Sequence, residues 1–232
     1  MLSVAGLDKT FGEAIALQDV SFHVVPGEIL GLVGPNGSGK TTLLECLCGL
    51  QTVERGDVSW HGRVVQPGRR KEVMFYVPDG ITPYPEHRAI DVLQFFADAF
   101  AQAKTVVDEI VDALALAPVL SKRVDTLSKG FRRRLLIGIG LLAPHPLLLM
   151  DEPFDGLDIR QTRDVATLLR SSATNSRTLF LSIHQLSDAE RICDRLVLLS
   201  NGHICGEGRL DELRMRAGLQ FGGLEDVFLA LT

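Results

Sequence analysis

The sequence has little that would place the chain in a membrane, on a nucleic acid or among secreted proteins. Its formal net charge is −5, so charge does not favour nucleic acid. The longest uncharged stretch, residues 135–150, is shorter than the roughly 20 apolar residues that span a bilayer, and prolines interrupt it. We expect a buried helix followed by a buried strand there. The N-terminus has neither a basic start nor an apolar core, so we expect no secretory signal.

Cysteine is scarce, and sequence repeats and low-complexity segments are missing. The four cysteines include no CxxC motif, which favours reduced, buried thiols. Hydrophobic residues make up 46% of the 232 residues, enough for a sizeable core. This length allows one large domain or two small ones.

Short β-branched and leucine-rich runs alternate with helical patterns along the chain. Strands are expected at Glu28–Val33, Val73–Val77, Leu147–Asp151, Thr178–Ile183 and Arg195–Ser200, with a hairpin turning at His61-Gly62. Helices are expected at about 39–49, 159–171 and 224–231, with capping boxes at Asp158/Gln161 and Ser187/Glu190. The alternation predicts an α/β fold with a mostly parallel core sheet.

One long segment breaks this alternation. Residues 78–85, PDGITPYP, carry three prolines and a glycine, which predicts a loop or hinge. From about 90 to 143 the pattern is helical, with no clear strand. We therefore expect one α/β core, residues 1–79 and 146–232, with a helical subdomain of about 80–145 inserted into it.

A phosphate-binding loop is predicted at residues 34–42, GPNGSGKTT, which contain the pattern G-x-x-x-x-G-K-[ST] between a strand and a helix. The glycines let backbone N–H groups turn towards phosphate, and the helix N-terminus adds partial positive charge. Lys40 is expected to reach the β and γ phosphates, Thr41 to bind Mg²⁺ and Thr42 to contact the α phosphate. The expected nucleotide contacts are Gly34, Pro35, Asn36, Gly37, Ser38, Gly39, Lys40, Thr41 and Thr42.

A second candidate site lies where the apolar run 147–150 ends in Asp151-Glu152. Carboxylates at the end of a buried strand are costly unless they meet a cation or a reacting group. Asp151 is placed to hold Mg²⁺ through water. Glu152 is placed to orient and polarise a water that attacks the γ phosphate.

Between these motifs lies Leu127-Ser128-Lys129-Gly130-Phe131, followed by three arginines. Alone, it could be an ordinary serine helix cap with a solvated basic face. Together with the other motifs, it resembles the signature sequence of ATP-binding cassette (ABC) ATPases, and nearly the whole chain is similar to the nucleotide-binding subunit of an ABC transporter. The resemblance implies a P-loop NTPase core, an N-terminal antiparallel β subdomain and the inserted helical subdomain.

The resemblance also assigns roles to single residues. Ser128 and Gly130 match the signature residues that bind the γ phosphate of ATP held by a second subunit. Lys129 and Phe131 depart from the usual Gly and Gln. Phe11 matches the aromatic residue that stacks on adenine, which is more often Tyr.

Two residues after the acidic strand also match the family pattern. His184 matches the switch histidine that contacts the γ phosphate and holds Glu152 and water in place. Asp158 matches a loop that crosses the interface between subunits, although it could equally be only a helix cap.

Asp79 is the sharpest departure, because the family usually has Gln there. That Gln touches Mg²⁺ and links the core to the helical subdomain. An aspartate still offers oxygen to Mg²⁺, but it is one methylene shorter and adds a negative charge near Glu152. We expect Asp79 to keep the metal role with altered geometry, so the metal set is Thr41, Asp79 and Asp151.

The resemblance implies an ATPase that powers transport. Two copies would close around two ATP molecules, each lying between Lys40 of one subunit and Ser128 of the other, with Glu152, His184 and Lys40 as the catalytic residues and Mg²⁺ as cofactor. A membrane-spanning permease on a separate chain would contact the hinge around 78–88 and the helical subdomain, at the cytoplasmic face of the membrane. The tail, residues 223–232, resembles exporter-type (ABC-2) ATPases.

Three other classes of protein are compatible with parts of the sequence. Soluble ABC ATPases act on ribosomes or DNA, but they carry two cassettes or long coiled coils, and the acidic charge argues against both. A regulatory module that holds ATP without hydrolysing it is supported only by Asp79, Lys129 and Phe131. A P-loop kinase or GTPase would not explain LSKGF or the ordered histidine.

Overall fold

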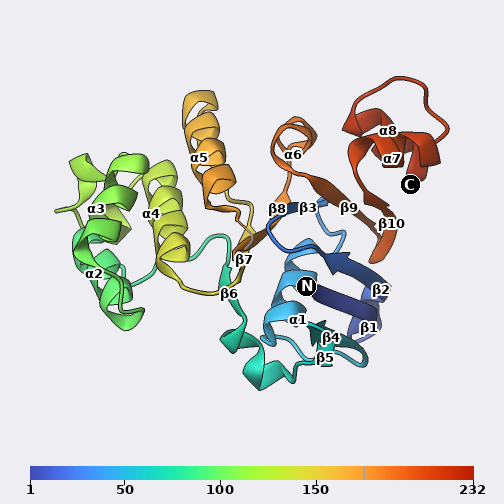
Figure 1. Ribbon diagram of the computed structural model, residues 1–232, viewed down its shortest axis with the longest axis horizontal. Coiled ribbons are helices and arrows are strands. Elements are labelled where there is room, and N and C mark those ends of the chain that lie inside the picture. Colours follow the sequence, from blue (N-terminus) through green and yellow to red (C-terminus); the bar gives the residue numbers. More distant parts are fainter. Residues whose placement is uncertain (175) are drawn as a thin grey trace.

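Two β-sheets and a group of helices organise the protein, as the computed structural model shows for residues 1–174 and 176–232 (Figure 1). The larger sheet has six strands in the order β10-β9-β3-β8-β7-β6. Its strands are β3 (Ile29–Val33), β6 (Met74–Val77), β7 (Leu147–Asp151), β8 (Thr178–Ile183), β9 (Arg195–Ser200) and β10 (His203–Gly208). All neighbours pair in parallel except β9 and β10. The predicted parallel core sheet is confirmed.

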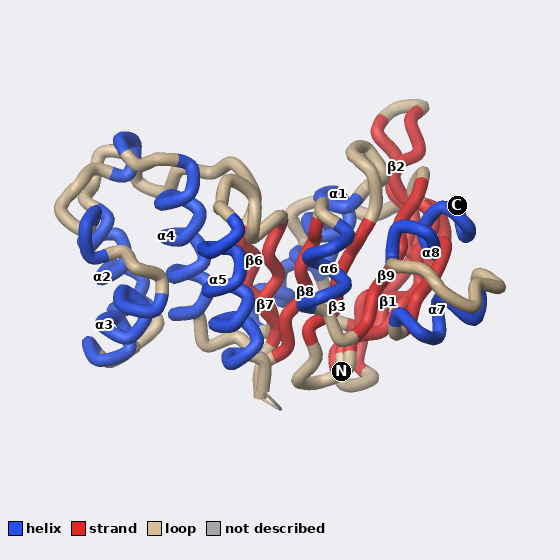
Figure 2. Tube along the Cα trace, turned by 90° about the horizontal axis from the view of Figure 1, so that it is seen from above, coloured by secondary structure: helices blue, strands red, loops and turns tan. Residues whose placement is uncertain are grey.

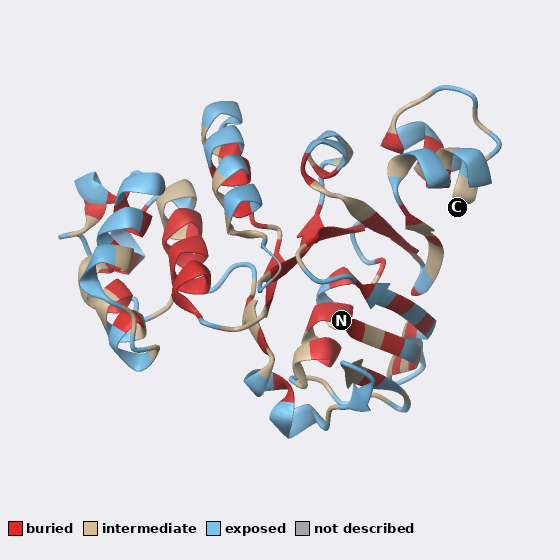
Figure 3. Ribbon diagram, viewed as in Figure 1, coloured by how far each residue is buried: buried red, intermediate tan, exposed pale blue. Residues whose placement is uncertain are grey.

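The core strands are apolar because the sheet is covered on both faces. Every residue of β3, β7 and β8 is buried (Figure 3). Strands buried on both faces form continuous apolar runs rather than alternating ones. Parallel pairing also brings the carboxyl ends of β3, β7 and β8 to one edge of the sheet, where the sequence places both candidate motifs.

The smaller sheet is antiparallel and is formed by the N-terminal part of the chain. It contains β1 (Leu2–Phe11), β2 (Ala14–Val24), β4 (Arg55–Trp60) and β5 (Arg63–Val64), in the order β2-β1-β4-β5. The predicted hairpin is present between β4 and β5. Helix α1 (Lys40–Cys48) buries leucines in the apolar cluster that joins this sheet to the larger one. The phosphate-loop helix is therefore fixed between the two sheets.

The helical group forms one end of the molecule (Figures 1 and 2). It contains α2 (Ala89–Ala99), α3 (Lys104–Ala113), α4 (Lys129–Leu142) and two short 3₁₀ turns, Ala117–Val119 and Val124–Thr126. Residues 78–85 form no helix or strand, as predicted for a hinge. Helix α4 is almost wholly buried beyond its first turn, because it packs on α2, α3 and β6. Division of the chain into a core and a helical subdomain at 80–145 stays a prediction, although these three helices all lie in that range.

The remaining helices surround the larger sheet. They are α5 (Ile159–Ser172), α6 (Leu186–Ile192), α7 (Leu210–Arg216), α8 (Leu224–Leu231) and the 3₁₀ helix Pro67–Glu72. Within the described parts of the chain, none of the helices has both the length and the apolar character needed to cross a membrane.

One predicted helix cap is confirmed and one is wrong. The N–H of Gln161 donates to Asp158 at 2.9 Å, and the N–H of Asp158 donates to Gln161 at 3.3 Å, which completes the first capping box. The expected Ser187/Glu190 box does not form, because α6 begins one residue before Ser187 and Gln185 precedes it. Glu190 instead accepts a hydrogen bond from the N–H of Leu224 at the start of α8.

The cysteines are less buried than the sequence suggested. Cys46 is buried, whereas Cys48, Cys193 and Cys205 are partly exposed. All four are free thiols. Burial raises the pKa of Cys46 to about 11 and that of Cys48 to about 12, so both are protonated and unreactive near neutral pH.

Candidate functional site

The phosphate loop connects the end of β3 to the start of α1. Gly37 and Gly39 have φ angles of 79° and 105°, in the left-handed region that favours glycine. A side chain at Gly39 would also place its Cβ 2.6 Å from the carbonyl oxygen of Ala16. The loop can therefore turn as the sequence predicted only because these positions are glycines.

Two polar side chains in this region, Lys40 and Ser38, indicate a binding site for an anion. Lys40 is buried, and its Nζ donates to the carbonyl oxygens of Gly34 at 2.8 Å and Pro35 at 3.0 Å. Burial lowers the pKa of Lys40, and the negative charges of Glu152 and Asp151 oppose this effect. Ser38 is 2% exposed, and its hydroxyl has no hydrogen-bond partner among the described residues. An unpaired buried hydroxyl is costly, so a bound phosphate oxygen would satisfy it.

Asp151 is surrounded by hydroxyl groups. Thr41, the second residue of α1, donates to its carboxylate at 2.7 Å, and Ser182 of β8 donates to the other oxygen. Tyr76 of β6 lies 3.4 Å from the same carboxylate. Burial and the nearby Asp151 raise the pKa of Tyr76 far above its usual range, so Tyr76 remains a neutral donor. The structure thus brings Thr41 and Asp151 together, as the predicted metal site requires.

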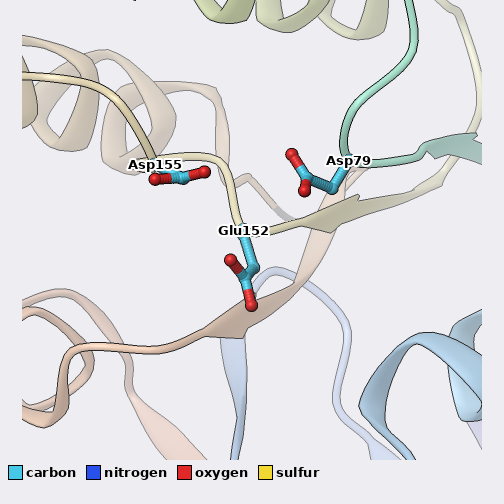
Figure 4. Close-up of side chains that lie close together, drawn as sticks. All are labelled: Asp79, Glu152 and Asp155. Atoms are coloured by element: carbon cyan, nitrogen blue, oxygen red, sulfur yellow. The ribbon is translucent and has the colours of Figure 1, made fainter. Parts of the chain in front are cut away.

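Glu152 lies in a different environment, although it is the next residue. Its φ angle is 49°, which is unusual for a residue with a side chain. Its N–H donates to the hydroxyl of Ser182 at 2.9 Å, so Ser182 holds both acidic residues. Figure 4 shows that the Glu152 carboxylate lies near those of Asp79 and Asp155, and ligand atoms of these three all lie within 4.8 Å of one another.

Asp79 forms an ion pair that the sequence did not predict. Its Oδ1 accepts from Nη2 of Arg133, a side chain that is 4% exposed, while Asp79 is 40% exposed. The structure therefore groups Asp79 with Glu152 and Asp155, and its expected role as a Mg²⁺ ligand beside Thr41 and Asp151 stays a prediction.

The signature stretch begins helix α4. The N–H of Phe131 donates to the Ser128 hydroxyl at 3.4 Å, so Ser128 is the helix cap. Lys129 pairs with Asp155 at 2.5 Å. A Cβ at Gly130 would lie 2.9 Å from the carbonyl oxygen of Gly156, so the helix start and the 155–158 loop touch within one chain.

The three arginines of α4 do not form the solvated basic face of the alternative interpretation. Arg134 is buried and donates to the carbonyl oxygen of Leu114 at 2.9 Å, and its guanidinium lies 4.2 Å from the Phe131 ring centre. Arg132 donates to Thr82 at 3.1 Å, and Arg133 pairs with Asp79. Each of the three guanidinium groups therefore has a hydrogen-bond or ion-pair partner within the same chain.

His184 and Phe11 lie on the surface where ligands could reach them. His184 follows β8 directly and lines a cavity of about 410 Å³ together with Glu152, Asp155 and the start of α5. Phe11 ends β1, is 50% exposed, and has the Lys9 ammonium 4.9 Å from its ring centre. Adenine stacking by Phe11, γ-phosphate contact by His184 and subunit coupling by Asp158 stay predictions.

Comparisons with known proteins agree with this geometry. The family model described as "ABC transporter" matches residues 17–155, more than half of the chain. The chain belongs to the ABC transporter family. This confirms the resemblance that the motifs indicated, and the chain is an ATP-binding cassette with the P-loop NTPase fold that was expected.

Several relatives of this cassette cover it almost completely. The ABC-type transporter ATP-binding protein EcsA of Bacillus subtilis (strain 168) is 29% identical over 100% of this chain and 96% of its own. The Nod factor export ATP-binding protein I of Bradyrhizobium diazoefficiens is 34% identical over 91% of this chain and 71% of its own. A solved ATP-binding subunit of an ABC transporter has a TM-score of 0.89 at 29% identity, covering 100% of this chain and 99% of that one.

Three residues of the cassette site were missed by the motif analysis. Ser182 is a polar residue in the apolar strand β8, one position before its end, which is a signal that could have been noticed. Tyr76 and Arg133 contact the site from β6 and α4, and only the three-dimensional arrangement shows it.

Proposed function

We propose that this cassette binds and hydrolyses ATP, and that hydrolysis powers export through a membrane-spanning permease on a separate chain. The observation that supports this most directly is the 2.7 Å bond from Thr41 to Asp151, because it joins the phosphate-loop helix to the acidic strand. Glu152 follows on that strand and lines one cavity with His184. A kinase or GTPase would not need this combination with the LSKGF helix start.

The phosphate loop and Asp151 fit a nucleotide with its metal. Lys40 would exchange its loop carbonyl partners for the β and γ phosphates, and the Ser38 hydroxyl would gain the partner that it lacks. Thr41 and Asp151 offer the oxygen ligands that Mg²⁺ prefers, and Asp79 is the third ligand that we propose. Mg²⁺, when bound there, would neutralise the negative charge of the phosphates.

Glu152 would act on water rather than on the metal. It has no hydroxyl donors to its carboxylate among the described residues, in contrast to Asp151, and it faces the cavity with His184. A carboxylate in this position can accept a proton from water and orient it for attack. His184 would hold the γ phosphate and keep Glu152 and water aligned.

A second copy of the chain would complete each site. ABC ATP-binding subunits work with membrane permeases and dimerise as a family. Ser128 is exposed at the start of α4, where free backbone N–H groups favour an anion. We propose that it contacts the γ phosphate of ATP that Lys40 of the other copy holds, in a homodimer.

The 78–88 loop and α2 carry the surface that we propose for the permease. Ile81, Tyr84 and Phe95 are 40%, 46% and 53% exposed, and the Tyr84 and Phe95 rings lie 5.4 Å apart. Grouped exposed apolar side chains are typical of protein contacts. The name of the relative that acts in Nod factor export supports export, and we place the cassette peripherally at the cytoplasmic face of the cell membrane.

Mixing two inactive variants tests the shared site. Lys40→Ala and Ser128→Ala should each be inactive, because each destroys both sites of a homodimer. Mixed in equal amounts, they should recover about a quarter of the wild-type rate, since half of the dimers are mixed and each of these has one intact site. Phosphate release is measured, with Ser121→Ala, another exposed serine of the helical group, as control.

Each outcome of the mixing experiment has a clear meaning. Recovery together with a rate that rises faster than linearly with protein concentration supports the shared site. No recovery, with Ser121→Ala fully active, rejects sharing between identical copies. ATP binding without hydrolysis at any concentration of wild type would instead indicate a regulatory ATP-binding module.

A further inference from the structure

The three carboxylates around Glu152 repel one another. Asp79, Glu152 and Asp155 offer ligand atoms that all lie within 4.8 Å of one another (Figure 4). Asp79 belongs to the 78–85 stretch, whereas Glu152 and Asp155 both belong to the loop between β7 and α5. Like charges this close repel one another and attract cations. If Glu152 accepts a proton from water, its carboxylate oxygens must stay free. The negative charge of the cluster must therefore be balanced by cations that bind Asp79 and Asp155 instead of Glu152.

Helix α4 supplies two cations to this cluster. Lys129 and Arg133 are four positions apart and therefore lie on the same face of the helix. Lys129 pairs with Asp155, and Arg133 pairs with Asp79. Glu152, the third carboxylate, has no ion pair among residues 1–174 and 176–232.

Arg133 is the stronger of these two partners. Its side chain is 4% exposed, whereas that of Lys129 is 66% exposed, so solvent screens the lysine pair far more. Arg133 also donates from Nη1 to the carbonyl oxygen of Asp151 at 3.2 Å. One guanidinium thus holds the carboxylate of Asp79 and the backbone of the catalytic strand end at the same time.

The hinge loop is attached to α4 at a second point as well. Arg132 donates to the hydroxyl of Thr82 at 3.1 Å. Asp79 and Thr82 both belong to the proline-rich stretch 78–85, so two neighbouring arginines fasten this loop to the signature helix. Asp79 uses Oδ1 for Arg133, which leaves Oδ2 free for another ligand.

We propose that Arg133 is the positioning residue that makes an aspartate workable at position 79: it neutralises Asp79, fixes it to the end of β7, and keeps Glu152 as the carboxylate that acts on water. Lys129 gives weaker help through Asp155. The inference rests on the proposed hydrolysis of ATP. It assigns Arg133 no contact with ATP, Mg²⁺ or water.

A set of charge-changing variants tests the pair. Arg133→Gln leaves Asp79 as an unbalanced charge, and Asp79→Gln leaves a buried guanidinium without its carboxylate, so each should lower kcat by about 10- to 100-fold. The double variant removes both charges, while the amide introduced at position 79 still offers an oxygen ligand. It should return to within about 3-fold of the wild-type kcat. KM for ATP should change by less than about 3-fold in all three variants, because Lys40 is untouched.

A metal-binding readout separates this role from general damage to the fold. Mn²⁺ binding is measured by electron paramagnetic resonance without nucleotide. Arg133→Gln should bind Mn²⁺ at least about 10-fold more tightly than wild type, because Asp79 and Glu152 are then two neighbouring carboxylates without an ion pair, and together they attract a cation. The double Arg133→Gln/Glu152→Gln variant should lose this gain. Arg69→Gln, which breaks an exposed pair with Glu72, is the matched control and should change nothing.

The proposal is overturned by either of two results. A double variant that stays as impaired as Asp79→Gln would mean that the loss at position 79 does not come from an unpaired Arg133, so the pair itself would not matter. An Arg133→Gln variant with wild-type kcat and wild-type Mn²⁺ binding would show that Arg133 does not neutralise the charge of Asp79. If wild type does not hydrolyse ATP, the proposed function fails, but Mn²⁺ binding still reports on the pair.

Discussion

Asp151 and Glu152 are neighbours in sequence, yet the protein treats their carboxylates in opposite ways. Asp151 ends the buried strand β7 and receives hydroxyl groups from Thr41 and Ser182. Glu152 turns out of the strand with a φ angle of 49°, and its neighbours are two carboxylates, Asp79 and Asp155. One residue is fixed by neutral donors, and the other is left with its oxygens free.

This difference follows from what each group is proposed to do. Hydroxyl donors stabilise the ionised form of a carboxylate and hold its oxygens in one orientation, which suits a group that binds a metal through water. A group that takes a proton from water must keep a free lone pair, so donors would compete with its substrate. Cationic side chains neutralise Asp79 and Asp155, the neighbours of Glu152, and leave the Glu152 carboxylate without an ion pair.

Among variants of Asp151 and its hydroxyl donors, Asp151→Asn should change the Mg²⁺ dependence of ATP hydrolysis most. It keeps the shape of the side chain but removes the charge that we propose holds Mg²⁺. The Mg²⁺ concentration for half-maximal ATPase activity should rise by about 10- to 100-fold. Titration of the rate with Mg²⁺ at saturating ATP measures this. An unchanged Mg²⁺ requirement would mean that Asp151 does not serve the metal.

Ser182→Ala should affect both sides at once. Its hydroxyl donates to Asp151 and accepts from the N–H of Glu152, so its removal leaves a buried carboxylate and a partly buried N–H with fewer partners. The free energy of unfolding in urea should fall by about 1–3 kcal/mol, and the ATPase rate should fall with it. Ser59→Ala, which loses only a 3.4 Å bond in the other sheet, is the control and should cost far less. Equal losses in the two variants would contradict the bridging role.

Glu152→Gly should change the free energy of unfolding less than Ser182→Ala does, and should raise it rather than lower it. A side chain at φ 49° costs free energy that glycine avoids, so the free energy of unfolding should rise by about 0.5–1 kcal/mol although hydrolysis is lost. Glu86→Gly, at a loop position without a positive φ, should be destabilising instead. A loss of stability in both variants would show that the backbone at Glu152 is not strained.

The sequence alone predicted the strands of the core with errors of only a residue or two. The runs 147–151, 178–183 and 195–200 match β7, β8 and β9, because strands covered on both faces are uniformly apolar and end at polar residues. The phosphate loop was equally clear, since its glycines are needed for the backbone turn. Such signals are local and need no knowledge of the remaining chain.

Contacts between distant segments were not predictable in the same way. Arg133 meets Asp79 across 54 residues, and Tyr76 meets Asp151 across 75. A run of three arginines indicates only a basic helix face until the packing of α4 against β6 is known. The Ser187/Glu190 box does not form because α6 begins one residue before Ser187, and Glu190 instead accepts a hydrogen bond from Leu224 of α8.

Glu152→Gln tests the central claim most directly. Binding of radiolabelled Mg·ATP and release of phosphate are measured on the same preparations of wild type and variant. We expect ATP affinity to stay within about 3-fold of wild type, while hydrolysis falls by about 10²- to 10⁴-fold and ATP-bound dimers accumulate. A variant that hydrolyses ATP at the wild-type rate, or one that loses ATP binding together with hydrolysis, would contradict the assignment of Glu152 to water and Asp151 to the metal.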